Sequence, residues 1–125
     1  MVTVGLTSEN GRQVAQGQKQ WEGRPLVGRA IHISSMSRVR FMVGSHRAPW
    51  YILCAVEEKE EYHTLEEMVA KRGRDLVPHV EGGEGRLVEY YKALSPGYCK
   101  HAETSDATPW CVPRWVAFRV KVICV

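Results

Sequence analysis

The stretch GQKQWEGRPLVGR, residues 17–29, concentrates charged side chains directly after a glycine. It contains the pattern G-x-K-x-x-E-x-R, which is formed by Gly17, Lys19, Glu22 and Arg24. The preceding residues predict a short helix, which the glycine can end because it takes the left-handed conformation at little cost. The residues that follow are predicted to be extended, so that their side chains alternate between two faces. From the residues alone, the three charged groups either form an ion-pair cluster at the surface or converge on one pocket.

These residue types suit the recognition of a nucleotide or a nucleic acid. Arg24 presents a planar fork of donors and Lys19 a compact positive charge, and both can bind a phosphate or a base edge. Glu22 has two candidate roles. It can hold the two cations in place as an ion pair, which at a surface contributes under about 1 kcal/mol. Alternatively, it can accept hydrogen bonds from an exocyclic amino group such as N4 of cytosine.

Trp21 lies inside the same motif and also has two candidate roles. A tryptophan can stack on a base, which contributes roughly 1–3 kcal/mol per base. In an extended segment, however, Trp21 shares a face with Lys19 and Gly23 and lies opposite Glu22. That placement favours packing in the core over stacking on a ligand.

Strands are predicted on both sides of this motif from hydrophobic patterns. Alternation of apolar and polar residues predicts strands at 38–43 and 115–125. The continuous apolar run at 50–58 predicts a strand that is covered on both faces. Residues 1–6 predict another short strand, and the polar, turn-rich residues 98–113 predict a long loop.

Three helices are expected in the remaining segments. Residues 7–17 predict a short helix that Thr7 or Ser8 caps. The segment HTLEEMVAKRG, residues 63–73, contains a T-x-x-E capping box and ends at a glycine. The segment GEGRLVEYYKALSPG, residues 83–97, has apolar residues at helical spacing before a Ser-Pro-Gly sequence.

This order of elements predicts an α+β fold, because the strands come mostly before and after two helices rather than alternating with them. With about five or six strands, a small partly closed β-barrel flanked by two to three helices is the natural way to bury them. The chain has 125 residues, which is the size of one domain, and we expect that domain to span residues 1–125.

The motif G-x-K-x-x-E-x-R resembles the signature of the ASCH (activating signal cointegrator homology) domain, a member of the PUA-like superfamily. Three later segments are similar to that family in the same order: YHTLEEMVAKRG with the VP that follows it, VEYYKAL, and VAFRVKVI. The resemblance covers nearly the whole chain. It implies a PUA-like barrel that binds RNA, another single-stranded nucleic acid or a nucleotide, in RNA metabolism or transcription coactivation. The implied ligand-binding residues are Gly17, Lys19, Trp21, Glu22 and Arg24. For the three charged groups of the motif, the resemblance favours one pocket over a surface ion-pair cluster.

Two kinds of hydrolase are alternatives to a binding module. Some ASCH-like proteins are amidohydrolases that deacetylate N4-acetylcytidine with the motif lysine and a threonine three residues later. Glu22 occupies that later position here, and a carboxylate cannot replace a hydroxyl nucleophile, so we expect no efficient hydrolysis of N4-acetylcytidine. A ribonuclease would use Lys19 or Arg24 to stabilise the developing charge and Glu22 as the base. The five histidines form no recognisable catalytic pattern.

Charge is unevenly distributed along the chain. Residues 1–50 hold seven Lys or Arg against two acids, whereas residues 57–67 hold six glutamates and one lysine. This predicts a basic face suited to an anionic partner and an acidic face elsewhere, or simply two solvated surfaces of opposite sign. An acidic working face would suit a protein-interaction adaptor in a larger complex, which is the third function class.

No metal or cofactor is expected. Cys99, His101 and Cys111 lack the paired C-x2-C spacing of a structural zinc site. Cys54 and Cys124 lie in apolar runs, where free thiols behave as small hydrophobic groups. The sequence shows no secretory signal and no apolar run long enough to cross a bilayer. We therefore expect an intracellular protein, cytoplasmic or, in a eukaryote, nuclear.

Overall fold

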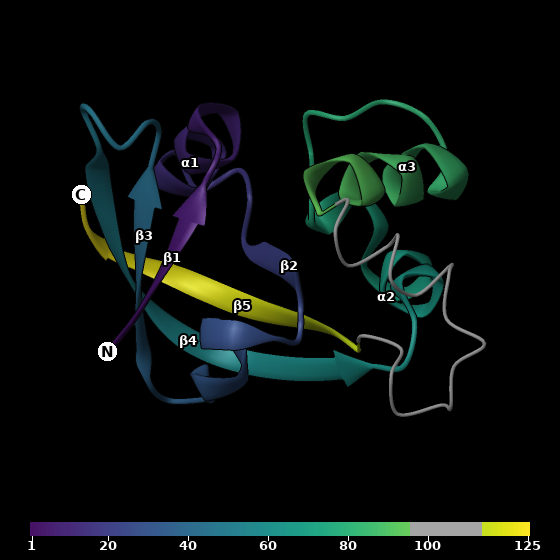
Figure 1. Ribbon diagram of the computed structural model, residues 1–125, viewed down its shortest axis with the longest axis horizontal. Helices are drawn as coiled ribbons and strands as arrows, with labels where there is room; N and C mark the ends of the chain where they lie inside the picture. Colours follow the sequence, from purple (N-terminus) through teal and green to yellow (C-terminus); the bar gives the residue numbers. More distant parts are fainter. Residues whose placement is uncertain (96–113) are drawn as a thin grey trace.

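The computed structural model describes residues 1–95 and 114–125, which form a curled five-stranded sheet with three α-helices (Figure 1). The predicted α+β class and the partly closed barrel of the PUA-like type are confirmed. The strands are β1 (Val2–Leu6), β2 (Trp21–Pro25), β3 (Arg38–Val43), β4 (Trp50–Tyr62) and β5 (Trp115–Cys124).

All three predicted helices are present, and two of them begin with the expected caps. The side chain of Thr7 accepts a hydrogen bond from the backbone N–H of Asn10. The side chain of Thr64 accepts one from the N–H of Glu67 at 3.2 Å, and the Glu67 carboxylate accepts one from the N–H of His63. The helices are α1 (Ser8–Ala15), α2 (Leu65–Arg72) and α3 (Glu84–Leu94), with short 3-10 helices η1 (Gly28–His32) and η2 (Gly73–Asp75).

The strand order β1-β3-β4-β5-β2 makes β1 and β2 the two edges of the sheet. β1 runs parallel to β3, and the other pairs are antiparallel. The curl brings the two edges of the sheet close to each other. Two hydrogen bonds cross between them: Arg24 of β2 donates to the β1 carbonyl of Gly5, and Arg29 of η1 donates to that of Thr3. We call the line where β1 faces β2 the seam. No backbone ladder joins β1 to β2 in the described chain, so side chains close the barrel there.

Two hydrophobic cores lie on the two faces of this sheet. The first fills the inside of the curl beneath α1 and contains Phe41 and Phe118, whose rings stack with centroids 6.3 Å apart. The second lies between the outer face of β2 and β5 and the helices α2 and α3, and it contains Trp21, Tyr91 and Trp115. β5 contributes to both cores, because its alternate side chains point to the two faces: Phe118 lies in the first core and Trp115 in the second.

β4 differs from its prediction in length and in burial. The prediction ended at residue 58, but the strand continues to Tyr62 because it pairs with β5 along most of its length. Ile52 and Cys54 are buried on the inner face, whereas Tyr51, on the outer face, is 43% exposed. The expectation of a strand covered on both faces is therefore wrong for its first half, where no helix of residues 1–95 or 114–125 covers Tyr51 on the outer side.

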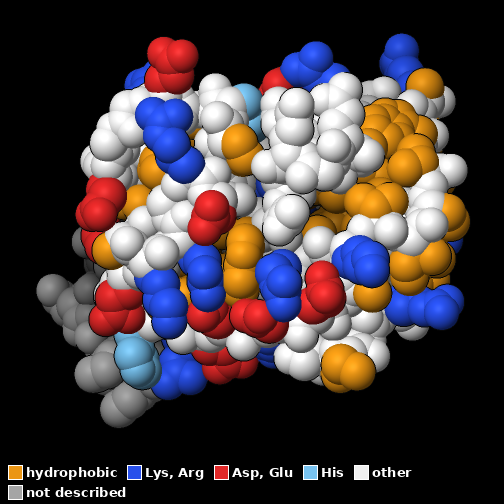
Figure 2. Space-filling view, turned by 180° about the vertical axis from the view of Figure 1, so that it is seen from behind, with side chains coloured by type: hydrophobic (Ala, Val, Ile, Leu, Met, Phe, Trp, Pro, Cys, Tyr) orange, Lys and Arg blue, Asp and Glu red, His pale blue; other side chains and the backbone are white. Residues whose placement is uncertain are grey.

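The acidic segment at 57–67 does not form a uniformly negative face. Glu58 forms an ion pair with Arg119 at 2.6 Å, and Glu60 forms one with Arg72 at the same distance. Figure 2 shows acidic and basic side chains side by side on the face seen from behind. This pairing reduces the charge that an adaptor surface would offer to a basic partner.

The cysteines behave differently from one another. Cys54 is buried and free, and burial raises its pKa to about 12, so its thiol is unreactive. Cys124 is free and exposed, contrary to the expectation of a packed hydrophobic group. Cys99, His101 and Cys111 lie outside the described residues.

Among residues 1–95 and 114–125, no cluster of His, Cys, Asp or Glu could hold a metal ion, and no helix is long and apolar enough to span a membrane.

Candidate ligand-binding site

A cavity of about 390 Å³ lies at one end of the seam, where the two edge strands meet α3. Its walls come from the end of β1, the start of α1, β2, the turn after β3, and α3. This volume falls within the range of small-molecule sites and can hold a nucleoside. We call it the seam cavity. The lining side chains that carry its chemistry are Asn10, Glu22, Arg24, Tyr90 and Tyr91.

Three buried polar atoms around the seam cavity have no hydrogen-bond partner in the described part of the protein. They are Oε2 of Glu22, the hydroxyl oxygen of Tyr91 and Oδ1 of Asn10. These residues are 4%, 3% and 4% exposed, respectively. A buried polar group without a partner costs about 1–3 kcal/mol, and folded proteins retain few of them. Three such groups on residues that line one cavity make it the candidate site for a polar ligand.

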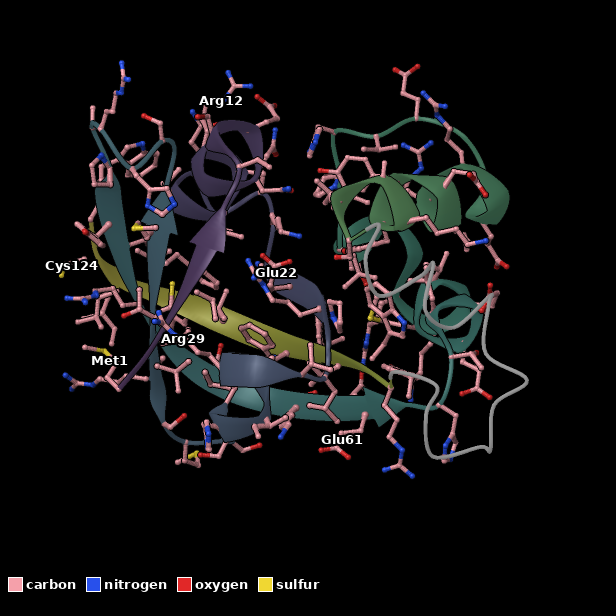
Figure 3. The ribbon with its side chains drawn as sticks, viewed as in Figure 1. Met1, Arg12, Glu22, Arg29, Glu61 and Cys124 are labelled. Atoms are coloured by element: carbon pink, nitrogen blue, oxygen red, sulfur yellow. The ribbon has the colours of Figure 1, made fainter. Side chains whose placement is uncertain are left out.

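One of the two carboxylate oxygens of Glu22, which Figure 3 labels, has no hydrogen-bond partner among the described residues. The other oxygen, Oε1, accepts a hydrogen bond from the N–H of Gly23 at 2.9 Å and lies 3.7 Å from Nζ of Lys19. Both contacts fix the carboxylate in one orientation. Oε2 has no such contact and is the acceptor that remains for a ligand.

Lys19 lies behind Glu22 rather than in the cavity. Its side chain is 0% exposed, and its ammonium group donates a hydrogen bond to the carbonyl of Leu76. Burial lowers the pKa of Lys19, and the neighbouring Glu22 opposes this shift. A phosphate therefore has no direct access to this ammonium group in the observed conformation. The structure instead gives Lys19 the role of holding Glu22.

Tyr91 supplies a hydroxyl group close to Glu22. Burial raises the pKa of Tyr91 well above its ordinary value, and the charge of Glu22 raises it further, so the hydroxyl remains a donor at neutral pH. Gly23 allows this close approach. A Cβ at position 23 would lie 3.0 Å from the Tyr91 hydroxyl oxygen and 2.8 Å from Cε of Met68.

Arg24 borders the seam cavity and spans the seam. Its guanidinium donates a hydrogen bond to the carbonyl of Gly5. Burial is the main cause of the lowered pKa of Lys19 and of the raised pKa of Tyr91; the charge of Arg24 adds to the first shift and offsets part of the second. Gly17, with φ of 76°, adopts the left-handed conformation that was predicted to turn the chain into this motif. The motif therefore does bring its charged groups together, with two of them in the cavity wall and the lysine one layer behind.

Trp21 packs in the second core instead of lining the seam cavity. It is 6% exposed, and the guanidinium of Arg72 lies 3.8 Å from the centroid of its ring system. Two hydrogen bonds to Glu60, of 2.6 Å and 2.7 Å, hold that guanidinium in place. Of the two candidate roles for Trp21, the structure fits core packing. The aromatic wall of the cavity comes from Tyr90 and Tyr91 instead.

Three lining residues of this region carry no sequence signal of their own. Asn10 lies in a helix whose polar residues mostly face solvent, and Tyr91 fits the apolar spacing of α3 equally well as a core residue. Arg29 belongs to the quoted stretch but lies outside the four-residue pattern. Only the close approach of α1, α3 and η1 to β2 relates these residues to the motif.

Solved structures with similar folds match nearly the whole chain. The crystal structure of hypothetical protein PH0355 matches with a TM-score of 0.67 and 19% identity, covering 97% of this chain and 97% of that one. Protein PF0455 from Pyrococcus furiosus matches with a TM-score of 0.63 and 16% identity, covering 98% and 96%. A scan against protein-family models finds no match, and a search of curated protein sequences finds none either.

Two variants of ZmASCH from Zymomonas mobilis also match. Their TM-scores are 0.56 and 0.58 at 12% and 13% identity. The alignments cover 96% and 99% of this chain but 66% and 75% of those chains. At such identities the likeness concerns the fold. The fold that the resemblance to ASCH domains implied is therefore confirmed.

Proposed function

We propose that this chain, which has the fold of an ASCH-domain protein, binds RNA or a nucleotide by holding an amino-bearing base in the seam cavity. One observation carries the proposal: the unpartnered polar atoms of Asn10, Glu22 and Tyr91 surround the same cavity. A ligand with complementary donors and acceptors would satisfy them, and the free energy of those hydrogen bonds would contribute to binding.

The chemistry of these groups favours cytosine or adenine. Each of these bases presents an amino donor beside a ring-nitrogen acceptor. Oε2 of Glu22 can accept from the amino group while the Tyr91 hydroxyl donates to the ring nitrogen. Uracil would place a carbonyl oxygen against the carboxylate, so that two acceptors face each other. We therefore expect the site to prefer cytidine over uridine.

The same geometry gives less support to the other function classes. For a ribonuclease, Lys19 is unavailable at the phosphodiester because it is fully buried, which leaves Arg24 as the one motif cation that could stabilise the developing charge. A protein adaptor would use the acidic segment at 57–67, where Glu58 and Glu60 are already paired with arginines. Binding of a base uses the groups that the fold leaves unsatisfied, and it is the function that we prefer.

The proposal predicts that base recognition depends on Glu22 and Tyr91. Calorimetric titration should show cytidine binding more tightly than uridine by about 1–3 kcal/mol. Glu22→Gln should remove most of this preference, because a neutral amide replaces the charged acceptor. Tyr91→Phe should weaken cytidine binding without lowering the unfolding temperature, since its hydroxyl has no partner in the described protein.

Glu66→Gln is the matched control for the loss of one carboxylate. Glu66 is exposed on α2 and lines no part of the seam cavity, so its substitution should leave cytidine affinity unchanged. If Glu22→Gln instead tightens binding to cytidine and uridine alike, Glu22 acts only as a neutralising ion-pair partner. Equal affinity of the unsubstituted protein for cytidine and uridine would also count against base recognition.

A further inference from the structure

We propose that a phosphate subsite adjoins the seam cavity and that Arg24 and Arg29 form it. The site would then take a phosphorylated nucleotide unit, either a phosphomonoester or a phosphodiester, rather than a bare nucleoside. This inference rests on the proposed function, because it assumes that the base occupies the seam cavity.

The first observation is a second cavity of about 310 Å³ that lies along the seam. It shares Gly5, Arg24, Pro25 and Ser95 with the wall of the seam cavity, so the two compartments adjoin. Arg29 lines only this second cavity and lies beside β1 (Figure 3). A nucleotide has the same two-part form, with a base on one side of its ribose and a phosphate on the other.

The second observation is the charge of this second cavity. Its described lining contains two arginines and no carboxylate. Neither Arg24 nor Arg29 takes part in any ion pair found among the described residues. By contrast, four described arginines each form an ion pair with a glutamate: Arg12, Arg72, Arg114 and Arg119. Positive charge is therefore left uncompensated along the seam.

The third observation is how the two guanidinium groups are held. Arg24 donates to the carbonyl of Gly5, and Arg29 donates to the carbonyl of Thr3 at 3.3 Å. These carbonyls belong to alternate residues of one strand edge, so they fix both side chains on the same side of β1. A guanidinium has five N–H donors, and one backbone hydrogen bond leaves the others for an anion. Arginine forks match the geometry of phosphate oxygens.

The test compares ligands with and without a phosphate at one ionic strength. The probes are cytidine, cytidine 5′-monophosphate, cytidine 3′-monophosphate, a cytidine-containing dinucleotide and inorganic phosphate. At least one monophosphate should bind about tenfold or more tightly than cytidine, because it adds a charge-assisted contact. Arg29→Gln should remove most of the difference in affinity between that monophosphate and cytidine. The matched control Arg47→Gln, at an exposed position that lines neither cavity, should keep it.

The possible outcomes separate this inference from the proposed function. Equal affinities for cytidine and both monophosphates would overturn the phosphate subsite while the base site stands. If cytidine does not bind but inorganic phosphate perturbs the Nε–H resonance of Arg29, the base site fails and the anion site stands. If cytidine does not bind and inorganic phosphate leaves the Nε–H resonance of Arg29 unchanged, both the base site and the phosphate subsite are wrong. A dinucleotide that binds more tightly than either monophosphate identifies the ligand as an RNA chain, and the opposite order identifies a free nucleotide.

Discussion

Lys19 is buried at a cost that its two contacts must offset. Transferring an ammonium group out of water costs several kcal/mol even after the protein relaxes around it. The carboxylate of Glu22 at 3.7 Å and the carbonyl of Leu76 provide the compensation. The pair is therefore less a source of stability than a means of fixing a carboxylate in one position inside the protein.

This arrangement predicts strong coupling between Lys19 and Glu22. Lys19→Met should destabilise the protein by about 3–5 kcal/mol, because it leaves a buried carboxylate without its cation. Combining it with Glu22→Gln should recover a large part of that loss, since both charges are then absent. Urea denaturation of the two single variants and the double variant measures the coupling. Additive losses would show that the two charges do not depend on each other.

The sequence reveals the site residues only in part. The spacing of the motif identified Glu22 and Arg24, because a turn followed by an extended segment directs nearby side chains to one place. The burial of Lys19 could not be predicted, since the carbonyl that receives its hydrogen bond lies 57 residues away. Asn10 and Tyr91 are recognisable as site residues only from their unpaired atoms in the folded chain.

At the level of the elements, α1 lies unusually close to the sheet. Gly11 faces β3, and a Cβ at that position would lie 2.2 Å from Cγ1 and 3.0 Å from Cβ of Val43. Asn10 directly precedes Gly11 in the same helix. The contact between Gly11 and Val43 therefore also sets the position of one wall of the seam cavity. The glycine is needed for close packing, although glycine weakens a helix by about 1 kcal/mol relative to alanine.

Two glycine-to-alanine substitutions should therefore have opposite effects. Gly11→Ala should destabilise the protein by about 1–3 kcal/mol, because the strain of overpacking exceeds the gain in helix propensity. Gly85→Ala, in α3, should stabilise it by about 0.5–1 kcal/mol, since nothing lies within 4 Å of the added Cβ. Thermal unfolding measures both effects. Stabilisation by Gly11→Ala would show that α1 can move away from β3 freely.

Short-range sequence patterns predicted most of the helices and strands. The second half of β4 was not predicted, because it depends on pairing with a strand that is distant in the sequence. The capping residues Thr7 and Thr64 determine where α1 and α2 begin, and such contacts span only a few residues. The second half of β4 is rich in glutamate and has no strand pattern of its own. It is a strand because β5 pairs with it, and Arg119 neutralises Glu58 across that pair.

For the whole molecule, uncompensated positive charge gathers along β1. Arg24 and Arg29 bind its backbone carbonyls, and Nε of Arg40 donates to Oγ1 of Thr3 at 3.1 Å. The acidic segment lies on β4 and α2, where many of its charges are paired. A single-stranded nucleic acid would therefore meet its strongest attraction on the side of the molecule that carries the seam.

Under the proposed function, this distribution predicts how binding to single-stranded RNA depends on salt. Three phosphate contacts should give a slope of roughly −2 in a plot of log affinity against log salt concentration, because each contact releases condensed counterions. Arg29→Gln should reduce the magnitude of that slope by about 0.7. Fluorescence anisotropy at several salt concentrations measures it. An affinity that does not change with salt would indicate that the ligand is a neutral nucleoside.

The arginines of the seam also protect the protein from self-association. The outer edge of a sheet presents free carbonyl groups, which a strand from another molecule can use to add itself to the sheet and begin an aggregate. On β1, the carbonyls of Thr3 and Gly5 already accept hydrogen bonds from Arg29 and Arg24. A foreign strand would have to displace both side chains before it could pair there. Protection of this edge and the proposed phosphate subsite thus depend on the same two residues, so a substitution that removes either arginine should weaken both.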